Sequence, residues 1–255
     1  MNSSNLIKLV KNMCNQWGID INRYPPSLPP DFESDVLEII DKVKSFTMTS
    51  PERIAALCQA VKYISTNKIS GEIVECGVWK GGSMMVIAQT LLNLNDVTRH
   101  LYLFDTFDGM PQPTEEDIDL EGIEAEKLLK ISDKKVQDSI WCYAALEEVK
   151  KNLNTINYPS EKIHYVQGKV EETIPENSPK TIALLRLDTD WYESTRHELI
   201  HLFPRLSHGS VIIIDDYGHW QGARKAVDEY LKDNHIPLLL NRIDVTGRIG
   251  IITKI

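Results

Sequence analysis

The sequence predicts an α/β fold with a seven-stranded, mostly parallel sheet, one antiparallel strand and helices on both faces. From Gly71 onward, short apolar stretches alternate with longer amphipathic stretches, which is the pattern of repeated strand–helix units. The stretches at 182–187 and 211–214 are continuously aliphatic apart from Arg186, which is typical of strands buried on both faces of a parallel sheet. The last two strands have no helix between them, so they should form a hairpin.

The elements follow from local signals along the chain. Residues 1–48 are predicted to form an N-terminal helical extension that makes substrate and dimer contacts. A domain at 49–255 then begins with a helix, because Thr49 offers a hydroxyl N-cap, Pro51 suits the first turn, and Glu52 follows Thr49 by three residues. The extension should hold helices at 1–24 and 32–46, the domain strands at 72–76, 101–105, 163–167, 181–187, 210–215, 237–241 and 248–253, and helices at 83–94, 139–154, 192–203 and 220–233.

The connection over 106–138 is abnormally long for a compact domain and is rich in aspartate and glutamate. Long loops of this kind are usually lids over a functional site or disordered segments. A solvated acidic face is an equally good interpretation of the acidic residues. We therefore expect a lid insertion at 106–138 and keep the second interpretation open.

Composition excludes several classes of function. A formal net charge of −9 argues against a general nucleic-acid binder, which needs a basic face. No segment approaches the apolar length of a membrane span, and residues 1–20 resemble an amphipathic helix rather than a signal peptide. The four cysteines are scattered without zinc-site spacing, which predicts free thiols. We expect a cytoplasmic protein that binds neither nucleic acid nor membrane.

Two predicted strands each end in a pair of aspartates, which are Asp188 and Asp190 after one strand and Asp215 and Asp216 after the other. Acids at the carboxyl ends of parallel strands point into the crevice where open α/β sheets bind ligands. Four carboxylates there would repel one another unless a proton or a cation lies between them. Mg²⁺, which prefers oxygen ligands, is the natural cation.

These acids also have a purely structural interpretation. Asp188 and Asp190 could cap a loop or pair with Arg186 and Arg196. Four acids at two strand ends beside a cofactor-type loop favour the metal site over this alternative.

The first strand runs into a glycine-rich turn that contains Gly77, Gly81 and Ser83 and leads directly into a helix. Its spacing differs from the dinucleotide pattern, which weakens a nicotinamide interpretation. Asp105 ends the second strand, where an acid can hydrogen-bond ribose hydroxyls. Glu75, just before the first glycine, would repel a pyrophosphate but suits a cofactor with ammonium and sulfonium groups, such as S-adenosylmethionine. The alternative is that Glu75 merely ends a strand.

Several separate motifs occur in an order that resembles the macrocin O-methyltransferase family over residues 45–255. The resemblance implies a class I (Rossmann-like) methyltransferase fold, S-adenosylmethionine, Mg²⁺ and usually a homodimer. It also implies methylation of a hydroxyl of a sugar on a natural product or glycan. The motifs are Phe46 to Arg53, Glu75 to Ser83, Leu103 to Met110, Leu187 to Tyr192 and Ile214 to Gly218.

The resemblance also assigns roles to individual residues. Asp188, Asp215 and Asp216 match the family's metal ligands, and Asp190 matches the acid proposed as general base in part of the family. Asp188 should also take part in catalysis and face the cofactor. Gly168, after the third strand, lies where this fold contacts adenine. His219 is the alternative base, because histidine titrates near neutrality.

Two other functions remain open at this point. A catechol-type O-methyltransferase acting on a small aromatic diol would use the same metal, since a catechol also offers two adjacent oxygens. A nicotinamide-dependent oxidoreductase would use a similar fold with another cofactor.

Overall fold

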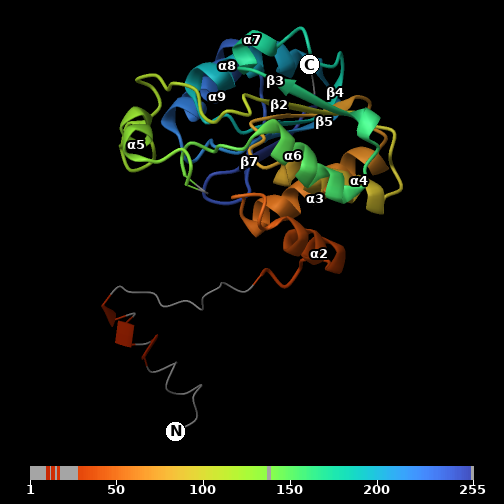
Figure 1. Cartoon of the computed structure of the whole chain (residues 1–255), viewed down its shortest axis with the longest axis horizontal. Coiled ribbons are helices and arrows are strands. Elements are labelled where there is room, and N and C mark those ends of the chain that lie inside the picture. The colour runs from red at the N-terminus through yellow and green to blue at the C-terminus, as the bar shows by residue number, and fades with distance from the viewer. Residues whose placement is uncertain (1–9, 12, 15, 18–27, 137–138, 254–255) are drawn as a thin grey trace. The chain divides into compact units, whose positions relative to one another are not determined.

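The structure is a computed structural model that describes residues 10–11, 13–14, 16–17, 28–136 and 139–253 (Figure 1). The chain divides into two compact units, at 1–33 and 34–255. Only the second unit is described below. The predicted helix over 1–24 falls largely outside the described residues.

The described residues form a seven-stranded sheet in the order β3-β2-β1-β4-β5-β7-β6. Neighbouring strands from β3 to β5 pair in parallel. β7 is the antiparallel strand, because it pairs antiparallel with both β5 and β6. The predicted sheet is therefore confirmed. Its strands are β1 (Glu72–Cys76), β2 (Leu101–Asp105), β3 (Ile163–Gln167), β4 (Ile182–Leu187), β5 (Leu206–Ile214), β6 (Asn241–Arg242) and β7 (Arg248–Ile251).

Helices cover both faces of this sheet (Figure 1). α2, α3, α4 and α6 pack together on one face, and α7, α8 and α9 pack together on the other. The helices are α2 (Ser34–Val43), α3 (Pro51–Thr66), α4 (Gly82–Asn93), α5 (Ala125–Ile131), α6 (Leu146–Leu153), α7 (Val170–Thr173), α8 (Tyr192–Leu202) and α9 (Gln221–Asp233), with short 3-10 turns at Asn154–Ile156, Ser160–Lys162 and Phe203–Arg205.

The core is centred on β4, in which every residue is buried. Its aliphatic side chains are at most 2% exposed, as expected for a strand with helices on both sides. Burying each such side chain stabilises the fold by about 1.5–3 kcal/mol relative to exposing it. Arg186 is the charged exception at 3% exposure, so its guanidinium must find anionic partners inside the protein.

Several predicted boundaries were wrong, and three of these have a clear local cause. Ser50 caps α3 in place of Thr49, since its hydroxyl accepts the hydrogen bond from the Arg53 backbone N–H (3.1 Å). The helix predicted at 139–154 is formed only by α6, because Cys142 adopts a left-handed backbone (φ 43°) that a helix cannot contain. The strand predicted at 237–241 shrinks to β6, because Pro237 has no N–H to donate to a ladder.

The insertion at 106–138 is held against the rest of the domain by a buried acid. The Asp117 carboxylate, in a residue only 1% exposed, accepts hydrogen bonds from the Tyr192 N–H (2.7 Å) and the Thr114 N–H (2.7 Å). Tyr192 is the first residue of α8, and the N-cap residue Trp191 provides no side-chain cap. Asp117 therefore caps α8 from the insertion, at the end where a negative charge is favourable. Whether the insertion acts as a lid remains a prediction.

Candidate active site

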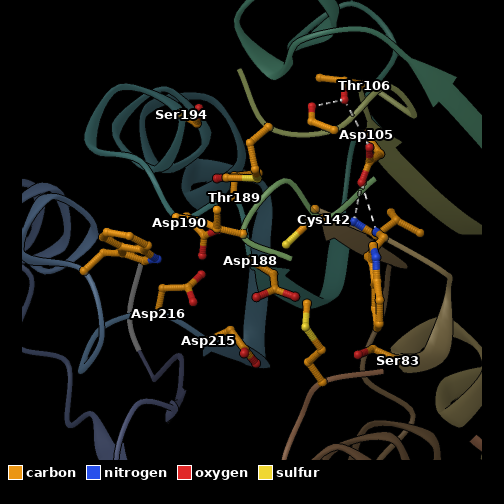
Figure 2. Close-up of a pocket in the computed structure, with 18 of the residues that line it drawn as sticks. Ser83, Asp105, Thr106, Cys142, Asp188, Thr189, Asp190, Ser194, Asp215 and Asp216 are labelled. Atoms are coloured by element: carbon orange, nitrogen blue, oxygen red, sulfur yellow. Dashed lines mark hydrogen bonds between the residues drawn. The ribbon is translucent and has the colours of Figure 1, made fainter. Parts of the chain in front are cut away.

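A pocket of about 530 Å³ opens at the carboxyl ends of β1, β2, β4 and β5 (Figure 2). This is the edge at which open α/β sheets bind ligands. Its walls include short segments at 46–49, 109–111, 139–140, 168–171 and 219–220, together with Cys142. Eight of the ten residues predicted for the site line it, and these are Gly77, Ser83, Asp105, Gly168, Asp188, Asp190, Asp215 and Asp216.

Three of the four strand-end aspartates converge. One carboxylate oxygen from each of Asp188, Asp215 and Asp216 lies within 4.8 Å of the others. The parallel pairing of β4 with β5 causes this, because Leu187 is in register with Ile214 and the next residues therefore emerge side by side. Asp216 Oδ2 is buried without a hydrogen-bond partner among the described residues. A set of hard oxygen donors with one unsatisfied atom fits Mg²⁺.

Asp190 lies beside this trio in a strained backbone conformation. Its φ of 66° is in the left-handed region, which is uncommon for a residue with a side chain. Burial, reinforced by the negative charge of Asp188, raises the pKa of Asp190 to about 7. Burial and the charge of Asp190 also raise the pKa of Asp216 well above its usual range, so repulsion between these carboxylates favours a proton on one of them when no cation is bound.

Arg186 supplies an internal cation beneath the same acids. Its Nη1 donates to Glu75 Oε1 (2.7 Å) and Asp188 Oδ2 (2.6 Å), and its Nη2 donates to Asp215 Oδ1 (2.6 Å). The predicted pairing of Asp188 with Arg186 is therefore present alongside the carboxylate trio. A buried guanidinium with three carboxylates reduces the repulsion among them, and removing it would leave uncompensated charge.

Glu75 lies below the pocket rather than in its lining. It is only 1% exposed, and its cross-strand partner in the β1–β4 register is Arg186. Burial raises the pKa of Glu75 to about 7, although the Arg186 charge opposes this. In this structure Glu75 reaches the pocket only through Arg186, so its predicted direct contact with a cofactor remains a prediction.

Asp105 organises the glycine-rich turn. Its Oδ2 accepts from the backbone N–H groups of Val78 (2.6 Å) and Trp79 (3.1 Å), and its Oδ1 accepts from Phe107 N–H (2.6 Å). Burial raises the pKa of Asp105, whereas these hydrogen bonds lower it. A Cβ on Gly77 would lie 2.0 Å from the Asp188 carbonyl oxygen, so only glycine lets these two strand ends approach.

Of two further residues considered from the sequence, one lies outside the pocket lining and the other lies within it. Gly81 does not line the pocket and instead precedes α4 with a left-handed backbone (φ 87°). His219 does line the pocket, and burial lowers its pKa, which favours the neutral imidazole.

Arg53 and Trp220 line the pocket but were not among the predicted site residues. Arg53, from the first turn of α3, forms an ion pair with Asp215. A cation in that position is unfavourable for a helix, which is a signal that could have identified it. Trp220 packs edge-on against Trp191 and lines the pocket. Its sequence context offers no comparable signal, since tryptophans in such positions are usually core.

Within the part of the chain that the structure describes, no helix has the length and apolar character needed to cross a membrane.

Comparison with known proteins places this site in a family. Residues 41–249 match the model of the macrocin O-methyltransferase (TylF) family. The demethyldecarbamoylnovobiocin O-methyltransferase of Streptomyces niveus is 31% identical over 202 residues, which cover 79% of this chain and 73% of that enzyme. A tetracenomycin-C rhamnosyl 4'-O-methyltransferase of Streptomyces olivaceus is also 31% identical, over 79% of this chain and 73% of that enzyme.

A solved structure gives the same assignment. That of the O-methyltransferase NovP superposes with a TM-score of 0.72 at 29% identity, covering 82% of this chain and 83% of that one. The fold is therefore the class I methyltransferase fold that the sequence predicted. The chain belongs to the macrocin O-methyltransferase (TylF) family.

Proposed function

We propose that this protein transfers the methyl group of S-adenosylmethionine to a hydroxyl of a sugar on a natural product or glycan, in a reaction that depends on Mg²⁺. The main support for this proposal is that Asp188, Asp215 and Asp216 converge in a pocket that they share with the glycine-rich turn. The relatives named above act on a novobiocin precursor and on a rhamnosyl tetracenomycin, which supports a glycosylated acceptor.

The cofactor half of the pocket lies over β1 and β2. Gly77, Ser83, Asp105 and Gly168 line it and would hold S-adenosylmethionine, which supplies an electrophilic methyl group on a sulfonium. Asp105 Oδ2 accepts two backbone hydrogen bonds, whereas Oδ1 accepts one and keeps a lone pair for a ribose hydroxyl.

The metal half lies over β4 and β5. Asp188, Asp215 and Asp216 would hold Mg²⁺, which supplies Lewis acidity and orients two adjacent hydroxyls of the acceptor. Arg186 and Arg53 neutralise part of the negative charge, so that the acids need not protonate when the site is filled.

Asp190 would accept the hydroxyl proton at its carboxylate as the acceptor oxygen bonds to the methyl carbon. The bond between that carbon and sulfur breaks, which leaves a methyl ether, S-adenosylhomocysteine and one proton on Asp190. Holding both reactants in line removes much of the entropic barrier of this bimolecular step.

The charge of the pocket favours an acceptor without anionic groups. Carboxylates outnumber Lys and Arg among its lining residues, and both Arg53 and Arg186 are already ion-paired. A neutral glycoside meets no repulsion there, whereas an acceptor that carries phosphate does.

The test is methyl transfer from labelled S-adenosylmethionine to a panel of glycosides and catechols, with and without EDTA. We expect transfer to glycosides that EDTA abolishes and Mg²⁺ restores. Asp188→Ala should lose both activity and metal response. Transfer to catechols alone would replace the sugar acceptor by an aromatic diol. Binding of NAD but not of S-adenosylmethionine in calorimetry would overturn the proposal.

A further inference from the structure

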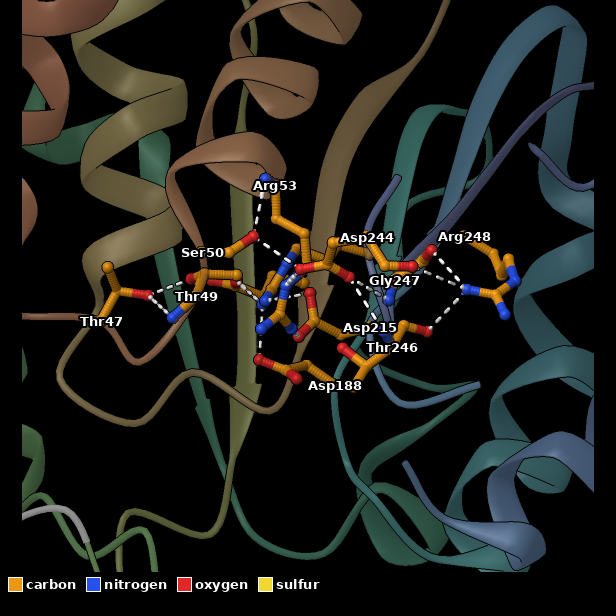
Figure 3. Close-up of polar contacts among 12 residues, drawn as sticks. Thr47, Thr49, Ser50, Arg53, Asp188, Asp215, Asp244, Thr246, Gly247 and Arg248 are labelled. Atoms are coloured by element: carbon orange, nitrogen blue, oxygen red, sulfur yellow. Dashed lines mark hydrogen bonds and ion pairs between the residues drawn. The ribbon is translucent and has the colours of Figure 1, made fainter. Parts of the chain in front are cut away.

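Arg53 occupies a position that a cation should avoid. It lies in the first turn of α3, where backbone N–H groups already present partial positive charge, and Ser50 caps this turn. The side chain is 16% exposed and forms ion pairs with two carboxylates, Asp215 and Asp244 (Figure 3). These partners come from the end of β5 and from the loop between β6 and β7, so one side chain joins three separate parts of the fold.

The first partner, Asp215, is held at both of its oxygens. Arg186 Nη2 donates to Asp215 Oδ1 (2.6 Å), and Arg53 Nη1 donates to Asp215 Oδ2. Rotating the carboxylate about its Cβ–Cγ bond would break at least one of these charge-assisted hydrogen bonds. The two guanidinium groups therefore fix the plane of a carboxylate that also lines the pocket.

The second partner, Asp244, ties the hairpin loop to Arg53. Its Oδ2 lies 2.9 Å from Arg53 Nε and accepts the Ser50 hydroxyl (2.6 Å). Its Oδ1 accepts from the backbone N–H groups of Thr246 (3.0 Å) and Gly247 (2.7 Å). A Cβ on Gly247 would lie 2.7 Å from Arg53 Cδ, so the loop accommodates the arginine only because this residue is glycine.

The two segments that Arg53 joins to Asp215, the start of α3 and the loop between β6 and β7, also form walls of the pocket. Thr49 precedes the cap of α3 and Thr246 follows Asp244, and both line the cavity. We propose that Arg53 is a positioning residue for the divalent-metal site. Arg53 fixes the orientation of Asp215 and holds these two walls in place relative to that carboxylate. This inference rests on the proposed function, because that proposal makes Asp215 a metal ligand.

Charge and positioning predict opposite effects when Arg53 is replaced. If the arginine contributed only its positive charge, its removal would strengthen the attraction of the site for a divalent cation. If it orients a ligand, its removal should weaken metal binding by about 10–100-fold, as for other residues that hold metal ligands. Whether metal affinity rises or falls on replacing Arg53 therefore distinguishes the charge effect from the positioning effect.

The experiment is calorimetric titration of Mn²⁺ into the full-length protein and three variants, with thermal unfolding as a check on folding. Arg53→Met should weaken Mn²⁺ binding by about 10–100-fold. Arg53→Lys keeps the charge but loses the planar fork, so it should lie between Arg53→Met and wild type.

Arg248→Met is the matched control. Arg248 Nη1 donates to the carbonyl oxygens of Asp244 (3.4 Å), Thr246 (3.3 Å) and Gly247 (2.8 Å), so this variant loosens the same loop without touching the ion pair to Asp215. Its Mn²⁺ affinity should stay close to the wild-type value.

Unchanged or tighter Mn²⁺ binding by a folded Arg53→Met variant would overturn the inference, as would an equal loss in Arg248→Met. If Arg53→Met does not fold, the test rests on Arg53→Lys. An Mn²⁺ affinity of that variant equal to wild type would then exclude a positioning role for Arg53. Absence of Mn²⁺ binding by the wild-type protein would instead overturn the proposed metal site, and this inference with it.

Discussion

Two carboxylates at the same edge of the sheet are held in contrasting ways. Asp105, at the end of β2, is held by backbone N–H groups of Val78, Trp79 and Phe107. Asp215, at the end of β5, is held by the guanidinium groups of Arg53 and Arg186. The first is fixed by neutral donors from the turns around it, and the second by charges from distant elements.

The difference matches what each half of the pocket is proposed to bind. A carboxylate held by backbone donors can offer its remaining lone pair to the hydroxyls of a neutral ribose. The β4–β5 half must accumulate several carboxylates for a divalent cation, and internal arginines lower the electrostatic cost of that accumulation when the cation is absent. Substitutions in the two halves should therefore have separable effects.

The largest separable effect is expected at Asp190, in the metal half. Asp190→Asn removes the proposed proton acceptor with little change in shape, so kcat should fall by about 10²–10⁴-fold. S-Adenosylmethionine affinity should stay close to wild type, because that ligand binds in the other half. Steady-state kinetics and calorimetry measure the two quantities, and Asp119→Asn, at another lining aspartate, is the control. A kcat close to wild type would remove Asp190 from the chemistry.

A smaller effect, in the opposite half, is expected from Asp105→Asn. The amide would turn an N–H₂ group toward backbone donors, which costs about 1–3 kcal/mol. Cofactor affinity should therefore fall by about 5–150-fold while Mn²⁺ affinity is retained. The control is Asp108→Asn, an exposed aspartate nearby whose carboxylate pairs only with Lys134 (3.0 Å) among the described contacts. Loss of Mn²⁺ binding in Asp105→Asn would show that the two halves are not independent.

The insertion should influence the metal half through Asp117. Asp117→Ala removes the cap of α8, which begins two residues after Asp190, and should lower the free energy of unfolding by about 0.5–2 kcal/mol. Urea unfolding measures this. Glu116→Ala removes only a surface ion pair with Lys225, which should contribute little because water screens it. If Glu116→Ala were the more damaging variant, the capping role of Asp117 would be wrong.

The smallest expected effect lies at the amino ends of β2 and β3, away from both halves of the pocket. Burial, with the neighbouring charge of His100, lowers the pKa of His164 in the folded protein. Below the usual histidine pKa of about 6.5 the unfolded chain binds more protons than the folded one, so stability falls as the pH falls through that value.

The measurement is the melting temperature at several pH values, for wild type and His164→Gln. The variant should lose less stability than wild type between neutral and mildly acidic pH. Identical pH dependence in the two proteins would assign the loss of stability to other groups.

The contrast between Asp105 and Asp215 also explains what the sequence could predict. The sheet was predictable because aliphatic runs such as β4 indicate burial on both faces, whereas the order of its strands came only from the structure. The turn around Gly77 and the acids after β4 and β5 were predictable because short contiguous motifs contain them. The convergence of Asp188 with Asp215 and Asp216 then follows from parallel pairing alone.

The remaining features depend on contacts between residues far apart in the chain. Arg53 reaches Asp215 across 162 positions, and Asp117 reaches Tyr192 across 75. Neither contact leaves a pattern in the local sequence beyond an unfavourable charge or an acid in an acidic loop. The first part of the predicted helix, at 139–145, was wrong for a related reason. Cys142 adopts a left-handed backbone, and the sequence gives no sign of this because the residue is not glycine.

The left-handed backbone of Asp190 has a consequence for the evolution of this protein in the laboratory. A residue with a side chain in that conformation costs on the order of 1–3 kcal/mol. Glycine would relieve this strain for about 0.5–1 kcal/mol of added chain entropy, and it would also remove one carboxyl group from a crowded cluster of acids. A selection for thermal stability alone would therefore favour glycine at this position and discard the residue on which the proposed proton transfer depends.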